Sequence, residues 1–130
     1  MFLTLSKAAM STSHFRELDV WNLAMDLVVD IYRTTKNFPT EEKYGLTSQI
    51  RRASVSVPSN IAEGQGRRTA GEFLNHLSIA RGSLMELRTQ IETALRLDFI
   101  SELQFEPLQA SANRVGKLLN GLINSLESKR

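Results

Sequence analysis

Apolar side chains recur at alternating intervals of three and four over four long stretches of the chain, and this spacing places them on one face of an α-helix. The stretches cover residues 19–36, 44–63, 69–97 and 102–126. Only short connections separate them, at 37–43, 64–68 and 98–101. Since short connections make neighbouring helices antiparallel, the pattern predicts an all-α protein, an up-down-up-down antiparallel four-helix bundle.

The apolar stripe of each helix predicts the residues of the core. In the third helix the steps of three and four persist for three heptads, as in helices that pack along a long seam. The expected core residues are Trp21, Ala24/Met25, Val28 and Ile31/Tyr32 in the first helix, Leu46, Ile50, Ala53, Val57 and Ile61 in the second, Phe73, Leu77, Ala80, Leu84, Leu87, Ile91 and Ala94 in the third, and Phe105, Leu108, Ala112, Val115, Leu119, Leu122 and Leu126 in the fourth.

Polar residues and one proline predict local features of the helices. Asp19 is the expected N-cap of the first helix, and residues 69–72 and 101–104 have the spacing of capping boxes. Pro58 lies inside the second helix, where it cannot donate a hydrogen bond to the carbonyl of Ser54. We therefore expect a kink or a local loosening of the helix at Pro58.

The first helix carries more apolar residues than one buried stripe needs. Val20, Leu23, Leu27 and Ile31 form a second stripe, about 100° around the helix from the first. Val55 lies nearly opposite the expected core of the second helix. Because a large exposed apolar patch usually marks an interface, we predict that Val20, Leu23, Leu27 and Val55 form an oligomer interface. The alternative is a first helix deeply buried within a monomer.

Three glycines lie inside the predicted helices, where each costs about 1 kcal/mol relative to alanine. They are Gly82, Gly116 and Gly121. The close approach of another helix would offset this cost, so these glycines add to the case for self-association.

The composition excludes several kinds of chemistry. The chain has 130 residues, 42% apolar and 23% charged, as in ordinary globular domains. It has no cysteine, which excludes disulfides, thiolate metal sites and cysteine nucleophiles. Its two histidines, His14 and His76, do not form the Glu-x-x-His pairs of a di-iron bundle, because Phe73 stands three residues before His76. The sequence therefore predicts neither catalysis nor a metal or other cofactor.

The N-terminal residues do not continue the helical pattern. They lack the basic and apolar regions of a secretory signal, and no stretch of the chain reaches the roughly 18–20 apolar residues of a membrane helix. We therefore expect a disordered leader over 1–15, a single domain over 16–128, a cytoplasmic location and no membrane partner.

Basic residues are concentrated in the middle of the chain. The net charge of the whole chain is only +2, but seven basic and three acidic residues give the segment 43–88 a charge of +4. Six of the seven are arginines, which bind phosphate bidentately. We predict that they bind nucleic acid, with Arg67 and Arg68 holding a phosphate beside the loop glycines Gly64 and Gly66. The six are Arg51, Arg52, Arg67, Arg68, Arg81 and Arg88. The alternative is a solvated face on which Arg81 and Arg88 pair with carboxylates of the same chain.

Several sequence blocks resemble a known family. They are residues 15–21 (FRELDVW), 44–53 (YGLTSQIRRA), 57–64 (VPSNIAEG) and 79–90 (IARGSLMELRTQ). Together they resemble the four-helix-bundle proteins encoded in intervening sequences of bacterial 23S ribosomal RNA genes. The accessory protein of diversity-generating retroelements is a relative of that family. The resemblance extends over nearly all of residues 15–126.

The resemblance implies a cytosolic bacterial bundle that assembles as a homopentamer. It also implies nucleic-acid binding through basic residues, and Arg51, Arg52, Arg67, Arg68 and Arg81 stand on motif positions. In the retroelement relatives a reverse transcriptase is the protein partner.

Two functional hypotheses follow. In the first, the protein is a non-catalytic oligomer that binds RNA or DNA phosphates without base specificity. In the second, it is a structural or adaptor protein whose outer apolar stripe binds a protein partner. The two are compatible if the apolar stripe builds the oligomer and the arginines face its opening.

Overall fold

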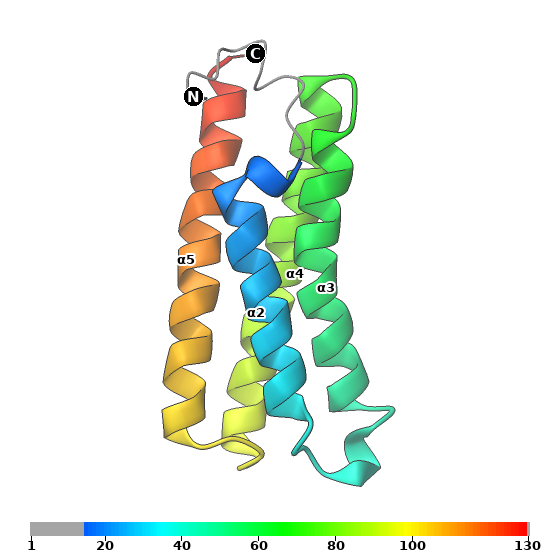
Figure 1. The fold of residues 1–130 in the computed structure, drawn as a ribbon, viewed down its shortest axis with the longest axis vertical. Coiled ribbons are helices and arrows are strands. Elements are labelled where there is room, and N and C mark those ends of the chain that lie inside the picture. The colour runs from blue at the N-terminus through cyan, green and yellow to red at the C-terminus, as the bar shows by residue number, and fades with distance from the viewer. Residues whose placement is uncertain (1–14, 130) are drawn as a thin grey trace.

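The computed structural model describes residues 15–129. Its elements are a short 3-10 turn η1 (Phe15–Glu17), helix α2 (Asp19–Thr35), a second 3-10 turn η2 (Thr40–Glu42), and helices α3 (Leu46–Gln65), α4 (Ala70–Arg96) and α5 (Glu102–Glu127), shown in Figure 1. The leader predicted over 1–15 lies, except for Phe15, outside the described residues.

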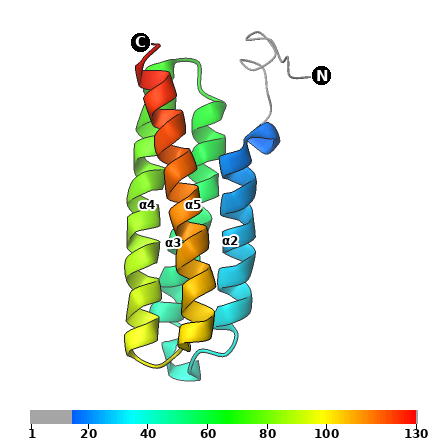
Figure 2. The ribbon, with the colours of Figure 1, turned by 90° about the vertical axis from the view of Figure 1, so that its left-hand side faces the viewer.

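The four helices form one bundle, and within residues 15–129 there is no strand, so the all-α prediction is confirmed. Successive helices run in opposite directions along the long axis (Figures 1 and 2). Each helix packs against two others: α2 and α4 both contact α3 and α5. The helices therefore form a ring in chain order, and the outer side between α2 and α3 lies opposite the outer side between α4 and α5.

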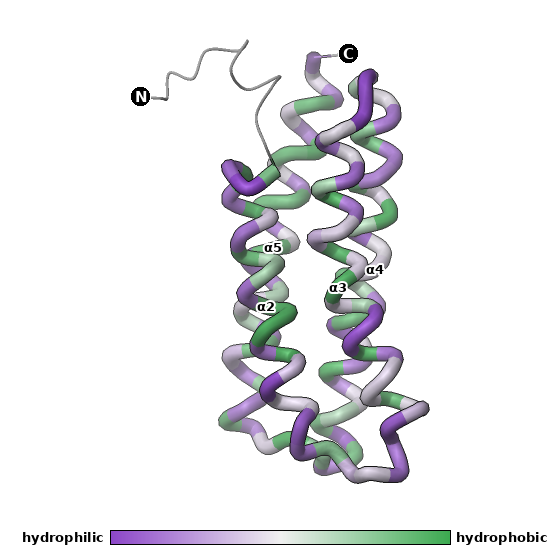
Figure 3. The backbone as a smooth tube through the Cα atoms, turned by 45° about the vertical axis from the view of Figure 1, so that its right-hand side comes forward, coloured by the Kyte–Doolittle hydropathy of each residue, from purple (hydrophilic) through white to green (hydrophobic). Residues whose placement is uncertain are grey.

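The core follows the predicted stripes in α3, α4 and α5. Apolar and polar residues alternate along these helices (Figure 3), and the stripe residues from Ile50 to Ile61 and from Leu77 to Ala94 are buried. In α5, Ile123 joins the predicted set. Two loop residues, Phe38 and Ile100, close the core at one end, where the ring of Phe38 lies 5.4 Å from that of Phe99.

In α2 the predicted core is right for Ala24 and Ile31 and wrong for the other residues of its stripe. Val20, Ala24, Leu27 and Ile31 are buried in the core, whereas Trp21, Met25 and Val28 are only partly buried and Tyr32 is exposed. The prediction that Val20 and Leu27 face outward is therefore wrong. Both stripes have helical spacing, and the pattern of a single helix does not show which of them its neighbours cover. Leu23, the third predicted outer residue of α2, is partly buried against the core.

The helix ends agree with the sequence except at Asp19 and at the capping box predicted over residues 69–72, of which only the bond to the Thr69 side chain forms. Leu18 occupies the N-cap position of α2 without a side-chain cap, and Asp19 is the first helical residue. Thr69 caps α4 by accepting from the Glu72 N–H, and Ser101 forms a complete capping box with Gln104 at the start of α5. Helix α3 continues through Pro58 without interruption.

Two helices approach each other closely at Gly64, a glycine for which the sequence predicted no such contact. A Cβ on Gly64 would be 2.7 Å from the His76 Cβ and 3.0 Å from the Phe73 Cδ1, so this glycine lets the end of α3 touch the start of α4. A Cβ on Gly82 or Gly121 would meet nothing within 4 Å, and one on Gly116 would be 3.4 Å from the Leu84 Cδ2. Gly82 and Gly121 therefore have no close helix neighbour within one chain, and their part in self-association stays a prediction.

Candidate nucleic-acid interface

The six candidate arginines are distributed over different surfaces of the bundle, and their surroundings differ. Arg51 joins α3 to α2. Its guanidinium lies 4.5 Å from the centre of the Tyr32 ring, and its Nε donates to the Thr35 Oγ1 at 2.8 Å. Its Nη2 also donates to the Tyr32 carbonyl oxygen at 3.3 Å. These contacts between α3 and α2 fix the Arg51 side chain and leave it poorly placed to reach a phosphate.

Arg67 and Arg68 lie in the loop between α3 and α4. The Nη2 of Arg67 is 2.9 Å from the Glu63 Oε2, so a carboxylate partly neutralises this charge. The Arg67 N–H donates to the Gly64 carbonyl oxygen, and Gly64 itself is buried against His76. Arg67 and Gly64, two members of the predicted phosphate site, are thus already engaged in contacts within the fold. Arg68 is exposed and forms no ion pair among the described residues.

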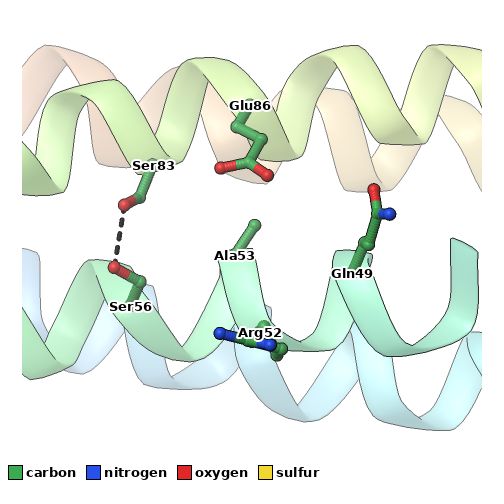
Figure 4. A pocket seen from close by; sticks show the side chains of 6 residues that line it. All are labelled: Gln49, Arg52, Ala53, Ser56, Ser83 and Glu86. Atoms are coloured by element: carbon green, nitrogen blue, oxygen red, sulfur yellow. Dashed lines mark hydrogen bonds between the residues drawn. The ribbon is translucent and has the colours of Figure 1, made fainter. Parts of the chain in front are cut away.

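Arg52 lines a polar groove of about 280 Å³ between α3 and α4, which Figure 4 shows. The other lining residues are Gln49, Ala53, Ser56, Ser83 and Glu86. The Ser56 and Ser83 hydroxyls are hydrogen bonded across the groove at 2.8 Å. The Glu86 carboxylate in the same groove would repel a phosphate, so this groove is a poor anion site.

Arg81 and Arg88 share a groove on the opposite side of α4, the α4/α5 groove, with a volume of about 370 Å³. It is lined by Arg81, Leu84, Met85, Arg88, Asn113, Gly116, Lys117 and Asn120. None of these lining residues, all within the described part of the chain, carries a carboxylate. The α4/α5 groove therefore combines three side-chain cations with a concave surface.

The partners of Arg81 and Arg88 are neutral amides. The Nη1 of Arg81 donates to the Asn120 Oδ1 at 3.4 Å, and the Nε of Arg88 donates to the Gln109 Oε1 at 3.4 Å. Within residues 15–129 neither arginine forms an ion pair, so the alternative of intrachain carboxylate pairing does not describe them. A hydrogen bond to a neutral amide orients a guanidinium without neutralising its charge, so both arginines remain available to an anion.

Lys117 is the functional candidate that the sequence reasoning missed. It follows Gly116, whose missing side chain leaves the floor of the groove open towards Leu84. The antiparallel register of α4 and α5 points to Lys117, because the Arg81–Asn120 and Arg88–Gln109 contacts place residues 113–117 between the two arginines. That register depends on tertiary packing, and the spacing within one helix does not contain it.

The outer side between α2 and α3 carries an apolar groove of about 310 Å³, the α2/α3 groove. It is lined by Phe15, Trp21, Met25, Val28, Val55, Pro58, Ser59 and Ala62. Val55 is 39% exposed and Tyr32, on the same side of α2, is 40% exposed. The outward stripe of α2 is thus the one that starts at Trp21, and Val55 adjoins it. This apolar face lies opposite the α4/α5 groove.

No group of three or more histidine, aspartate or glutamate side chains lies close enough to hold a metal ion within residues 15–129. None of the described helices has the length and apolar character needed to cross a bilayer.

Comparisons with known proteins match this fold. The model of a family described as 23S rRNA-intervening sequence protein matches residues 16–121. A crystal structure of a protein with unknown function from the S23 ribosomal protein family of Bacteroides thetaiotaomicron is similar, with a TM-score of 0.75 and 26% sequence identity. That match covers 81% of this chain and 95% of the other. The comparison with curated proteins found no match.

Proposed function

The chain belongs to the family of 23S rRNA-intervening sequence proteins, and we propose that it is a non-catalytic, homo-oligomeric module that binds the phosphate backbone of RNA or DNA. The α4/α5 groove is the proposed binding surface. The observation that carries the proposal is the set of three cations, Arg81, Arg88 and Lys117, around a groove whose lining residues include no carboxylate.

The geometry of the groove favours contacts to the backbone of a nucleic acid over contacts to its bases. Arg81 and Arg88 are seven residues apart on α4, so they are separated by about 10 Å along the helix and face different phosphates. The residues that line this groove, all described, include no aromatic side chain on which a base could stack. Binding through phosphates alone is insensitive to sequence and sensitive to salt.

Self-association through the apolar face is the second part of the proposal. The α2/α3 groove, with Val55 39% exposed, leaves apolar side chains exposed on one side of a single bundle, as interfaces do. Because this surface lies opposite the α4/α5 groove, association would leave the grooves open. Each additional copy would add another groove, and linked weak sites bind a long polymer much more tightly than one site does. The family resemblance favours five copies.

The nucleic-acid proposal is tested by titrating labelled RNA and DNA at several salt concentrations. We expect the logarithm of the affinity to fall linearly with the logarithm of the salt concentration. The variant Arg81→Gln/Arg88→Gln should reduce the slope by about 2 and weaken all sequences alike. The control Arg33→Gln/Arg114→Gln removes two exposed charges of the same sign outside the groove. No binding at about 50 mM salt, or equal losses in both variants, would refute the proposal.

The oligomer is tested by light scattering. One chain has a mass of 14.6 kDa, so five chains have a mass of roughly 73 kDa. We expect Val55→Glu, which places a charge on the α2/α3 face, to shift the mass towards that of one chain. A wild-type protein that stays at the single-chain mass would contradict self-association.

An adaptor that uses the same apolar face is the second candidate, because the α2/α3 groove suits an apolar side chain of another protein equally well. It predicts a monomer without salt-sensitive nucleic-acid affinity. A partner captured by the wild type would then be lost on Val55→Glu.

A further inference from the structure

The two ends of the bundle have different surfaces. At one end, where α3 ends, α4 begins and α5 ends, lies a groove of about 300 Å³, here called the end groove. Its apolar floor consists of the partly buried side chains Leu18, Phe73, Leu122 and Leu126. None of its lining residues, all within 15–129, is acidic, and three of them are basic: Arg68, Lys129 and Arg67, whose charge is partly neutralised by Glu63 at 2.9 Å.

The opposite end presents exposed apolar side chains. The three most exposed large apolar residues among those described are Leu103, Tyr44 and Leu97, at 88%, 86% and 53% exposure. All three belong to the connections at that end or to the helix ends beside them (Figures 1 and 2). An isolated exposed leucine needs no explanation, but the three highest exposures at one end form a pattern.

Acidic residues accompany the exposed leucines. Leu103 lies in the first turn of α5, between Glu102 and Glu106 in sequence, and Asp98 follows Leu97 in the connection from α4. We call Leu97, Leu103 and these carboxylates the acidic knob. All three acidic residues are exposed, and no ion pair involving them occurs in the described part of the chain.

We propose that the acidic knob of one copy docks into the end groove of the next copy. Leu103 and Leu97 would cover the apolar floor, and Glu102 and Glu106 would face Arg68 and Lys129. The two surfaces are complementary in both hydropathy and charge, and a single chain carries both. Thr69 and Ala70, at the start of α4, also line the end groove, and the positive end of a helix dipole further favours carboxylates there.

The symmetry of this contact determines what it builds. It joins two different surfaces, so it is heterologous, and since it stacks copies along the long axis it does not close on itself. The product is a head-to-tail chain of bundles. This inference does not rest on nucleic-acid binding or on the α2/α3 face, both of which lie along the sides of the bundle.

The contact should be weak between single bundles. Packed helices lie about 8–10 Å apart, so one end of the bundle offers on the order of 400 Å². A stable interface takes about 800 Å² from each partner. Charge pairs at the rim of such a contact are screened by salt, and parallel contacts between side-by-side oligomers would strengthen it.

The test uses two full-length variants with opposite defects. Arg68→Glu/Lys129→Glu inactivates the groove and leaves the knob intact, whereas Leu103→Lys inactivates the knob and leaves the groove intact. Arg68, Lys129 and Leu103 are all exposed, so we expect both variants to fold. Both variants also carry Val55→Glu, which removes any association through the α2/α3 face.

Sedimentation at increasing protein concentration gives the readout. We expect the Val55→Glu parent to form growing chains up to about 1 mM, and each defective variant alone to associate at least about tenfold more weakly. An equal mixture of the two should form pairs of about 29 kDa, twice the single-chain mass, because only one junction is possible. A further control, Leu118→Lys/Arg114→Glu on the side of α5, should associate like the parent.

Two results would overturn the proposal. One is a parent that stays at the single-chain mass throughout, and the other is a mixture that associates no better than its components. Failure of the α2/α3 interface is distinguishable, because the wild type and Val55→Glu would then have the same mass at the lowest concentration. Failure of nucleic-acid binding appears only in the titration.

Discussion

Replacing Gly64 with alanine should destabilise the protein, although alanine is the better helix former. The added Cβ would lie 2.7 Å from the His76 Cβ, 3.0 Å from the Phe73 Cδ1 and 3.2 Å from the Phe73 carbonyl oxygen. Carbon atoms pack at about 3.5–4.0 Å, so the closest pair would be short by about 0.8 Å. Two of the three neighbouring atoms belong to the backbone of α4 or are attached directly to it, and they cannot move without moving the helix.

The cost follows from what a separation of α3 from α4 would break. The Asn60 side chain lies 3.2 Å from the His76 Nδ1, and the Ser56 and Ser83 hydroxyls are 2.8 Å apart across the same pair of helices. Overpacking of this kind costs about 1–3 kcal/mol. The helix propensity of alanine returns at most about 1 kcal/mol, and less near the end of α3. We therefore expect a net loss of about 1–2 kcal/mol in the free energy of unfolding.

Gly82→Ala and Gly121→Ala are matched controls, because a Cβ at either position meets nothing within 4 Å. Each should stabilise the protein by up to about 1 kcal/mol. Thermal and urea unfolding followed by circular dichroism would measure all three, at roughly 3–6 °C per kcal/mol for a chain of this size. A Gly64→Ala variant as stable as Gly82→Ala would refute the steric argument.

Three further substitutions test other contacts by the same unfolding assays. Asp98 has a positive φ of 62° after α4, so Asp98→Gly should raise the stability by about 0.5–1 kcal/mol, and Asp98→Ala should not. Ser101→Ala removes the capping-box bond that the Ser101 Oγ accepts from the Gln104 N–H at the start of α5 and should cost about 1 kcal/mol. Arg51→Gln should cost about 1–2 kcal/mol, because it removes the contacts to Tyr32 and Thr35, yet leave the salt slope of nucleic-acid binding unchanged. A slope reduced as much as by Arg81→Gln would contradict the structural role of Arg51.

The sequence predicts the helices well because the signals for them are local. Each observed helix boundary lies within two residues of its prediction, and the capping box at Ser101 is present. The stripes of α3, α4 and α5 are also right, since each of these helices has one dominant apolar stripe. Helix α2 has two, and its burial is decided by α3 and α5. A pattern within one helix cannot show which stripe its neighbours cover.

The candidate site is harder to predict for the same reason. All six arginines have the same side chain, but the partners that distinguish them come from other helices or from a neighbouring turn. Arg51 contacts Tyr32 and Thr35 across a seam, whereas Arg81 contacts Asn120, 39 positions away in the sequence. The register between antiparallel helices fixes these pairs, and it depends on how the cores interlock.

The position of the α4/α5 groove makes the two parts of the proposed function compatible. A phosphate backbone can approach Arg81, Arg88 and Lys117 only if no other copy covers them. The apolar α2/α3 groove, around Val55 and Trp21, lies on the far side of the ring of helices. Burial of that surface would therefore stabilise an oligomer while the charged side of every copy stays in contact with solvent. An interface that included Lys117 would instead have to desolvate its charge, at a cost of several kcal/mol.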